Sequence, residues 1–429
     1  MQSQKVSLLP TKSDLKDLRR SPLRDLIAGM TVAVIALPLA LAFGAASGLG
    51  PAAGITTAII AGAVAAIFGG SKLQVSGPTG AMTVVLIPVF AGFGAQGVLL
   101  VGLLAGILLI AMAVLKLGAH VHRLPTALIE GFTAGIAVII GLQQLGNLLG
   151  VKPAGGQSIL NFAFDAIGLA FKSLNLIALI MGFSLASFIL ICATFWPKVP
   201  FSIIAIALAT VIANLFDLKV ERIGSIPAVI GVWDVGFLKT THLADLVPAA
   251  IAVAVLAALE SLLSAKVADR MRGSGEHHDP NREVFGQGLA NIAVSLFGGV
   301  PATAALARTA VNVRAGANSK LAAFSHAVFL AGIVLLGSSL VGQIPLAALA
   351  GVLLATAAHM VKPEELRRTA KNSWLDLIIL TATFAVTVFV DIISAVVVGL
   401  VLSLLLRKTV LARVSTRLPP IDAEETLGD

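Results

Sequence analysis

Two stretches decide the fold: LQVSGPTGAMTVVL at residues 73–86 and GGVPATAALARTAV at residues 298–311. Each contains a short extended segment with a proline, Pro78 or Pro301, from which a helix begins. Proline suits a helix start because it lacks the N–H that would have no partner there. Both stretches lie within apolar sequence, so the sequence predicts one interrupted helix in each half of the chain.

The composition places these stretches in a membrane. Hydrophobic residues make up 57% of the 429 residues, and only 12% are Asp, Glu, Lys or Arg, about half the charged fraction of a soluble domain. Apolar blocks such as 26–46 and 97–115 approach the roughly 20 residues of a spanning helix. These values exclude a disordered chain, a nucleic-acid-binding module and an ordinary two-domain cytosolic enzyme.

Hydrophobic blocks between charged or Pro/Gly breaks predict an all-α polytopic membrane protein with fourteen elements. The third and tenth elements are too short to cross as full helices. The predicted elements are 27–46, 52–69, 78–93, 97–116, 126–148, 174–195, 200–216, 247–266, 284–299, 303–315, 320–339, 345–361, 374–391 and 392–408.

A weak internal repeat relates the two halves. Seven elements separate the copies, and an odd number inserts the second half upside down, which predicts an inverted repeat of seven plus seven. Three matches occur in the same order: AAIFGG at 65–70 with VSLFGG at 294–299, LAGI at 104–107 with LAGI at 330–333, and LPTALIEGF at 124–132 with IPLAALAGV at 344–352.

The distribution of basic residues predicts the orientation. With the N-terminus inside, 24 of the 30 Lys and Arg residues fall in inside segments and five fall outside. This asymmetry predicts a multi-pass protein of the cell (inner) membrane with both termini in the cytoplasm. The remaining cation is Arg308, which lies at membrane depth. No metal-binding, nucleotide-binding or nucleophile motif is present.

The interrupted helices suggest a binding site. A helix that begins at mid-membrane leaves its first N–H groups unpaired and directs partial positive charge at one point. Two such starts facing each other would form an anion site; two ordinary kinked helices are the weaker alternative. Arg308 would add positive potential, or would instead bond helix carbonyls in a structural role.

Glu260 is the second charge at membrane depth, with Ser264 one turn later on the same face. The carboxyl group could carry a proton during transport, or it could hold Na⁺ together with Ser264. A simple ion pair with Arg308 is a third possibility.

These motifs resemble the SulP family of anion transporters, the sulfate-permease group, over residues 20–410. The likeness rests on TVAVIALPLALAFGAASGLGP at 31–51, GPTGAMTVV at 77–85 and PATAALARTAVN at 301–312. It implies a uracil-permease-like fold in which a core domain moves against a gate domain like an elevator, usually in a homodimer. The implied divisions are a cytoplasmic N-terminal segment (1–26), core (27–118 and 247–339), gate (119–246 and 340–410) and a short cytoplasmic tail without the family's STAS domain (411–429).

The resemblance also assigns roles to residues of this chain. Glu260 and Ser264 match a cation-coupling pair. Glu260 stands where a sodium-coupled relative has Asp, so a proton is favoured over Na⁺ as the coupling ion, and no other cofactor is expected. The residues that the resemblance assigns to anion binding are Phe43, Thr79, Gly80, Ala304, Ala305, Leu306 and Arg308.

The sequence therefore predicts a secondary active transporter, not an enzyme. Its expected partners are a small inorganic or carboxylate anion and membrane lipid, with bicarbonate or a small dicarboxylate ahead of sulfate. The alternatives are a passive anion channel or exchanger of the same fold, which the buried Glu260 disfavours, and a nucleobase:cation symporter, which Arg308 disfavours.

Overall fold

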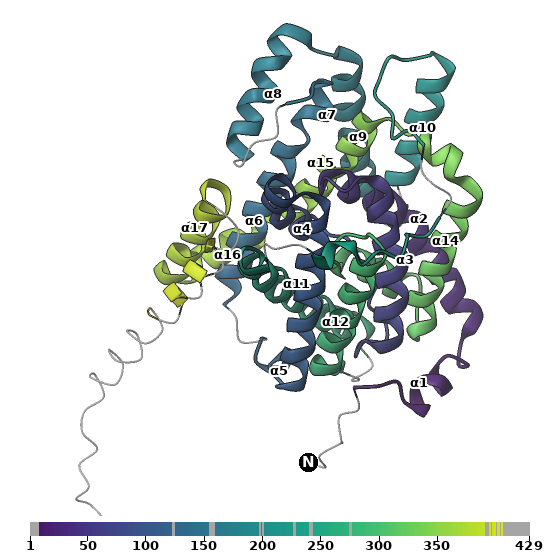
Figure 1. Ribbon diagram of the computed structural model, residues 1–429, viewed down its shortest axis with the longest axis vertical. Helices are drawn as coiled ribbons and strands as arrows, with labels where there is room; N and C mark the ends of the chain where they lie inside the picture. Colours follow the sequence, from purple (N-terminus) through teal and green to yellow (C-terminus); the bar gives the residue numbers. More distant parts are fainter. Residues whose placement is uncertain are drawn as a thin grey trace, which may run out of the picture. The chain divides into compact units, whose positions relative to one another are not determined.

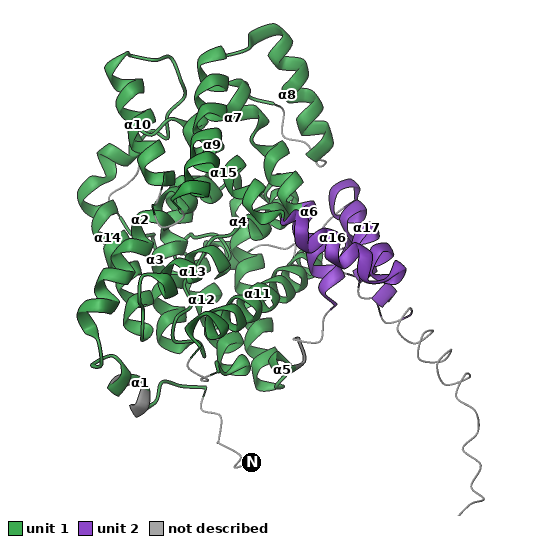
Figure 2. Ribbon diagram, turned by 180° about the vertical axis from the view of Figure 1, so that it is seen from behind, with its two compact units in different colours: residues 1–123, 136–361 green, residues 124–135, 362–429 purple. Residues whose placement is uncertain are grey.

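The computed structural model describes residues 8–121, 125–153, 159–196, 199, 201–225, 229–239, 243–273 and 277–390, and single residues or short runs between 394 and 405. The chain forms two compact units, Met1–Arg123 with Ile136–Val361 and Leu124–Gly135 with Lys362–Asp429 (Figure 2). The predicted division into core and gate stays a prediction.

Helices occupy the predicted elements (Figure 1). Among the described residues, eight spans are long and apolar enough to cross a membrane, and α10 and α17 are shorter apolar helices. The predicted element at 392–408 and the predicted tail at 411–429 lie largely or wholly outside the described residues. The helices that match the predicted elements are α2 (Pro22–Ala46), α3 (Pro51–Phe68), α4 (Gly80–Val114), α6 (Thr126–Gln143) with α7 (Leu145–Leu149), α9 (Leu176–Phe195), α10 (Phe201–Leu215), α11 (Leu243–Arg272), α12 (Pro280–Leu296), α13 (Leu306–Arg314), α14 (Lys320–Gly342), α15 (Leu346–Met360) and α17 (Trp374–Phe389).

The two interrupted helices form as predicted. α4 joins the predicted third and fourth elements through a kink at Gly94, whose φ of 63° lies in the left-handed region that glycine adopts readily. α13 has only nine residues. Strand β1 (Ser76–Gly77) precedes α4, and strand β2 (Thr303–Ala304) precedes α13. The two strands pair antiparallel, with Ser76 opposite Ala304 and Gly77 opposite Thr303.

Small side chains allow the helices around these strands to pack closely. α12 packs against α3 and α4, α11 packs against α4, and α14 packs against α2 and α3. Along α2 the buried face is rich in alanine, including Ala33, Ala36 and Ala40. Such residues let helix backbones approach one another closely. Close packing matters in a membrane because the hydrophobic effect does not drive helices together in lipid.

Several helix starts follow local capping chemistry. Pro51 and Pro280 occupy the first positions of α3 and α12. The Asp279 carboxylate accepts two backbone N–H groups of the first turn of α12, and the Ser319 hydroxyl accepts one in α14. These caps satisfy amides that have no partner inside the helix.

Four short helices and one longer helix lie where no element was predicted. α8 (Ile159–Ser173) has two charged residues and only 15 residues, so it lacks the long apolar block on which the predictions rest. The short helices are α1 (Lys12–Asp17), α5 (Gly118–Val121), η1 (Gly236–Lys239) and α16 (Pro363–Asn372).

Apart from η1 (Gly236–Lys239), the described residues of the connection between α10 and α11 contain little regular structure. Arg222 forms an isolated bridge with Pro345. Backbone bonds from Ile223 N–H to Ile344 C=O and from Gly224 N–H to Gly342 C=O, each 3.0 Å long, continue this pairing. The connection after α10 is therefore tied to the connection before α15.

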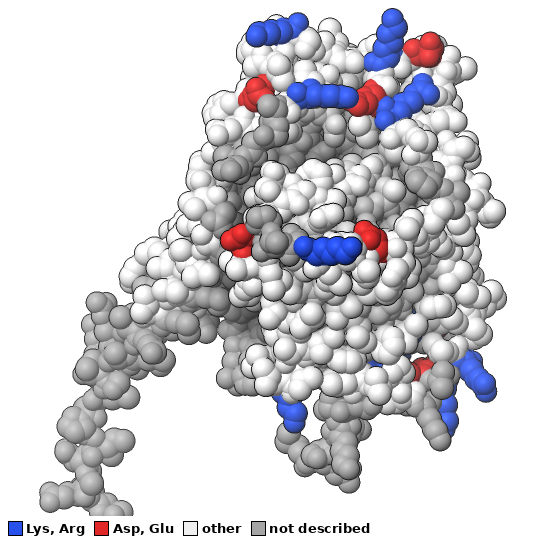
Figure 3. All heavy atoms as spheres, in the orientation of Figure 1, with Lys and Arg blue, Asp and Glu red and all other residues white. Residues whose placement is uncertain are grey.

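The surface is that of an integral membrane protein. Large apolar side chains point outward on many helices; Leu336 is 91% exposed and Phe171 is 89% exposed. On the face drawn in Figure 3, charged side chains gather toward the two ends and in a short row across the middle, separated by uncharged surface.

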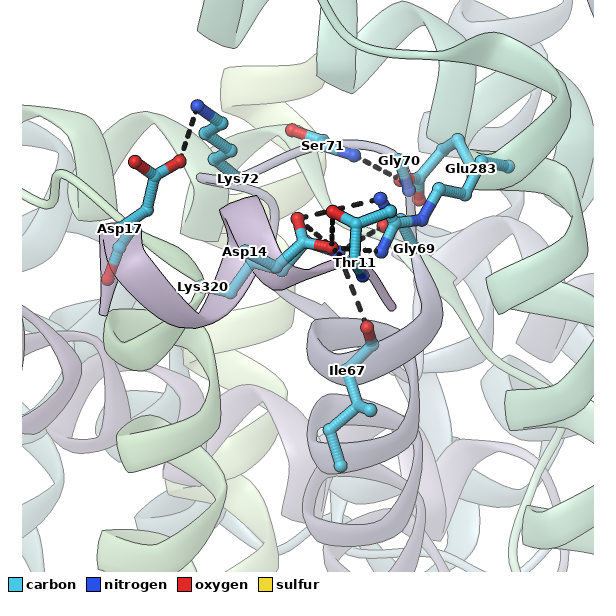
Figure 4. A network of polar contacts seen from close by, with 12 residues as sticks. Thr11, Asp14, Asp17, Ile67, Gly69, Gly70, Ser71, Lys72, Glu283 and Lys320 are labelled. Atoms are coloured by element: carbon cyan, nitrogen blue, oxygen red, sulfur yellow. Dashed lines mark hydrogen bonds and ion pairs between the residues drawn. The ribbon is translucent and has the colours of Figure 1, made fainter. Parts of the chain in front are cut away.

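A polar network joins α1 to the ends of three other segments (Figure 4). Arg282 Nη2 donates to Asp14 Oδ2 at 2.7 Å, and Lys320 Nζ lies 3.8 Å from Asp14 Oδ1. Lys320 Nζ also donates to the carbonyl of Gly69 at 2.5 Å. A further ion pair joins Asp17 to Lys72 at 2.7 Å. These contacts fix the amino-terminal helix to α12, α14 and the segment that leads into β1.

Candidate anion-binding site

The β1–β2 pair brings the starts of α4 and α13 together. Around it, Ala304 N–H donates to Ser261 Oγ at 3.1 Å, and Ala305 N–H donates to the carbonyl of Val75 at 3.1 Å. Thr57 of α3 accepts the N–H of Val300 at 2.7 Å. The second extended segment is therefore held by α3, α11 and the first extended segment.

These bonds involve two of the residues assigned to anion binding, and that assignment stays a prediction. Ala304 and Ala305 were expected to offer their amides to the anion, but both amides already donate to acceptors of the protein. The Ala304 amide donates to a side chain of α11, whereas the Ala305 amide, just beyond β2, extends the pairing of the two extended segments. Leu306 is the first residue of α13, so the N–H groups without an acceptor inside the helix begin there.

The start of α4 gathers three of the predicted residues. Thr79 is the residue before the first turn and Gly80 is its first helical residue. A Cβ on Gly80 would lie 3.1 Å from Phe43 Cε1 and would overlap Ile140 Cδ1, so a larger residue here would have to displace the Ile140 side chain. Phe43 is 5% exposed and Thr79 is 8% exposed. The structure thus brings Phe43, Thr79 and Gly80 together.

Glu260 lies beside Thr79. The Thr79 hydroxyl donates to Glu260 Oε2 at 3.0 Å, and the carboxyl group is partly buried. Ser264 is fully buried and donates its hydroxyl to Thr309 Oγ1 at 3.1 Å. Within the described residues, no hydrogen bond joins Glu260 to Ser264. Both lie on α11, but Glu260 bonds Thr79 before α4 and Ser264 bonds Thr309 of α13.

Arg308 is 1% exposed, and it donates Nη2 to the carbonyl of Pro78. This bond runs from one half-helix to the segment before the other, and it matches the structural role considered above. Nε and Nη1 have no hydrogen-bond partner in the described structure. The charges of Arg308 and Glu260 interact, but no direct ion pair joins them among these residues. A buried cation with two unused donors can bind an anion.

Four further polar residues of the site were not predicted. Asn312 Nδ2 donates to the carbonyl of Leu73 at 2.7 Å, and Thr309 Oγ1 accepts the N–H of Val75 at 3.2 Å. Ser261 Oγ lies 2.9 Å from Thr303 Oγ1. Their signal in the sequence is a hydroxyl or amide side chain within an apolar block, which is weak because such residues are common in membrane helices.

Comparison with known proteins decides the family. Residues 23–383 match the model of the sulfate permease family. The chain belongs to the sulfate permease family. Its membership confirms the resemblance on which the site residues were assigned, and it makes the protein an anion transporter and not an enzyme.

Relatives of this sulfate permease family member include two bacterial transporters. It is 38% identical over 385 residues to YvdB of Bacillus subtilis (strain 168), which is provisionally named a sulfate transporter, covering 89% of this chain and 72% of the relative. It is 34% identical over 390 residues to the bicarbonate transporter BicA of Picosynechococcus sp. (strain ATCC 27264 / PCC 7002 / PR-6), covering 87% and 68% respectively.

Solved structures share the fold. The transmembrane domain of a cyanobacterium bicarbonate transporter BicA aligns with a TM-score of 0.80 and 32% identity, covering 88% of this chain and 98% of that one. Murine Slc26a9 in the inward-facing state aligns with a TM-score of 0.82 at 17% identity, covering 95% and 74%, and supports the fold alone. The predicted all-α fold of the seven-plus-seven type is confirmed.

Proposed function

We propose that the protein is a secondary active transporter that binds a small anion between the starts of α4 and α13 and couples its movement to a proton on Glu260. Bicarbonate or a small dicarboxylate is the proposed substrate, ahead of sulfate. The similarity to a named bicarbonate transporter over 87% of the chain supports bicarbonate as the first anion to test.

One observation carries the proposal: β1 and β2 pair in register and place the two half-helix starts side by side. Each start directs unpaired N–H groups and a partial positive charge toward the same region. Arg308 adds two unpaired donors beside Gly77, where any side chain would overlap its Nη1. This combination suits a small anion that accepts several hydrogen bonds.

Glu260 is the proposed proton carrier. Thr79, at the start of α4, donates to its carboxylate, so a proton on Glu260 would change the hydrogen bonding next to the anion. Sodium is the less favoured ion because Ser264, the other expected ligand, donates to Thr309 and not toward Glu260. An ionisable group at membrane depth is by default a functional one.

The proposed movement is an elevator-like shift of core against gate. Helices of the predicted core pack on one another, α12 on α3 and α4 and α14 on α2 and α3, while α9 packs on α10 and α15 of the predicted gate. Homodimerisation and cytoplasmic termini belong to the same proposal.

Uptake of radiolabelled bicarbonate, fumarate and sulfate into proteoliposomes, with imposed H⁺ or Na⁺ gradients, tests the proposal. We expect accumulation of at least one anion driven by the H⁺ gradient, and its loss in Glu260→Gln. Glu364→Gln, which removes an exposed carboxylate of α16, is the matched control. Gradient-driven accumulation that persists in Glu260→Gln would refute the coupling, and uptake that no gradient accelerates would establish a passive exchanger instead.

A further inference from the structure

One helix behind the site presents a regular row of buried polar side chains. Glu283, Gln287 and Asn291 follow one another at intervals of four residues on α12, so they lie on one face. Glu283 is 2% exposed, and Gln287 and Asn291 are completely buried. We refer to these three residues as the α12 polar row. Buried polar groups are costly unless they are hydrogen-bonded, so their partners indicate what they are for.

The first member of the α12 polar row holds the entry to the first extended segment. Glu283 Oε2 accepts the N–H groups of Gly70 and Ser71, each at 2.9 Å (Figure 4). These two residues follow the end of α3 and lead toward β1. A carboxylate that accepts two backbone N–H groups forms charge-assisted bonds, which are stronger than neutral ones.

The second member holds β1 itself. Gln287 Nε2 donates to Ser76 Oγ at 2.7 Å and to Glu283 Oε1 at 2.9 Å. Ser76 lies three residues before Thr79, the residue that precedes the first turn of α4. The position of this half-helix start is thus linked to α12 through one short segment.

The third member holds the other extended segment. Asn291 Oδ1 accepts the N–H of Ala302 at 2.8 Å, and Asn291 Nδ2 donates to the carbonyl of Ala302 at 2.9 Å. The side-chain amide of Asn291 thus bonds both the N–H and the carbonyl of Ala302, as the backbone of a neighbouring strand would. Ala302 lies directly before β2 and four residues before Leu306, the first residue of α13.

We propose that the α12 polar row fixes the spacing of the two half-helix starts, and that Gln287 and Asn291 are positioning residues that set the affinity of the site for its anion. A single rigid helix bonded to both segments prevents either start from shifting alone. Binding groups must be held within about 0.5 Å of their working positions for full effect. The inference rests on the function proposed above, since it concerns the same anion.

Substitution by leucine removes the side-chain hydrogen bonds of Gln287 or Asn291 and puts an apolar side chain of similar size in place of the amide. Asn291→Leu and Gln287→Leu are compared with Gln144→Leu, which replaces another buried amide whose bond goes to the carbonyl of Ile140 within its own part of the chain. Purified variants are titrated with bicarbonate, sulfate and fumarate, and hydrogen exchange is followed in the peptides that contain residues 74–79 and 300–306.

We expect Kd for the bound anion to rise about tenfold or more in Asn291→Leu and Gln287→Leu, which corresponds to about 1.4 kcal/mol, and to stay within about twofold of wild type in Gln144→Leu. Exchange should accelerate in peptide 300–306 of Asn291→Leu and in peptide 74–79 of Gln287→Leu. Uptake should show a higher KM with a smaller change in maximal rate, a division that loss of stability alone would not produce.

Wild-type affinity in Asn291→Leu and Gln287→Leu would overturn the inference, as would an equal loss in Gln144→Leu. If the wild type binds none of the three anions, the proposed function fails, and unchanged exchange in both peptides would then refute the positioning role independently. Should Asn291→Leu not fold, Asn291→Asp, which keeps the acceptor for Ala302 N–H and removes the donor, is measured by the same criteria.

Discussion

Replacing Arg308 by methionine separates its role in the fold from its role in the site. In the part of the chain that the structure describes, the Arg308 guanidinium makes one hydrogen bond, to the carbonyl of Pro78, and Arg308 is 1% exposed. A hydrogen bond from a charged donor contributes about 1.5–3 kcal/mol, whereas a cation at membrane depth costs about 2.5–3.5 kcal/mol. The two effects nearly cancel, so Arg308→Met should change the melting temperature without anion by about 4 °C or less.

Anion binding should respond much more strongly to the same change. The two unpaired guanidinium donors, if they bond the anion, each contribute about 1.5–3 kcal/mol. Loss of one such bond weakens Kd about 10- to 150-fold. At an anion concentration 100 times the wild-type Kd, the wild type gains about 2.7 kcal/mol of stability, while a variant with 100-fold weaker binding gains about 0.4 kcal/mol.

Thermal unfolding in detergent, with and without bicarbonate, measures both quantities at once. Arg314→Met, which removes the exposed cation at the end of the same helix, is the control and should retain the full stabilisation by bicarbonate. If Arg308→Met also retains the stabilisation by bicarbonate, the guanidinium serves only to bond the carbonyl of Pro78, and the reasoning about its free donors is wrong.

Two further predictions concern stability. Gly342→Ala should lower the free energy of unfolding by about 1–3 kcal/mol, because its Cβ would overlap the carbonyl oxygen of Gly224, whereas Gly337→Ala meets nothing within 4 Å; thermal unfolding of the two variants compares them. Burial raises the pKa of Asp14, but hydrogen bonds from Arg282 and a backbone N–H outweigh it and, with nearby cations, lower the pKa from 3.8 to about 2. The resulting stabilisation is therefore complete above pH 3.8 and is lost as the pH falls through about 2. Stability curves against pH should show the wild type above Asp14→Asn by about 1 kcal/mol at neutral pH after solvent screening, with the gap closing toward pH 2; a gap independent of pH would contradict the assignment.

Much of the site was accessible from the sequence. Pro78 and Pro301 mark the two interruptions, and the helices begin at Gly80 and Leu306, within a few residues of them. Glu260 and Arg308 were conspicuous because charges are rare in apolar blocks. The partners of these groups were not predictable, because Thr79 and Pro78 are distant in sequence from the residues they bond.

The α12 polar row shows the same limit. Gln287 and Asn291 stand in a helix with other polar residues, and nothing in the sequence distinguishes them from side chains that face solvent. Their proposed role follows from their hydrogen bonds to Ser76 and Ala302. Only the packing of α12 behind both extended segments brings these residues within hydrogen-bond distance.

The sequence by itself determined that this is a membrane protein with two interrupted helices, because hydrophobic length and the missing N–H of proline act locally along the chain. The tertiary structure decided which amides remain for an anion. Ala304 and Ala305 lose theirs to Ser261 and Val75, and the free amides begin at Leu306. Hydrogen bonds between segments distant in sequence are set by strand register and helix packing, which no local pattern encodes.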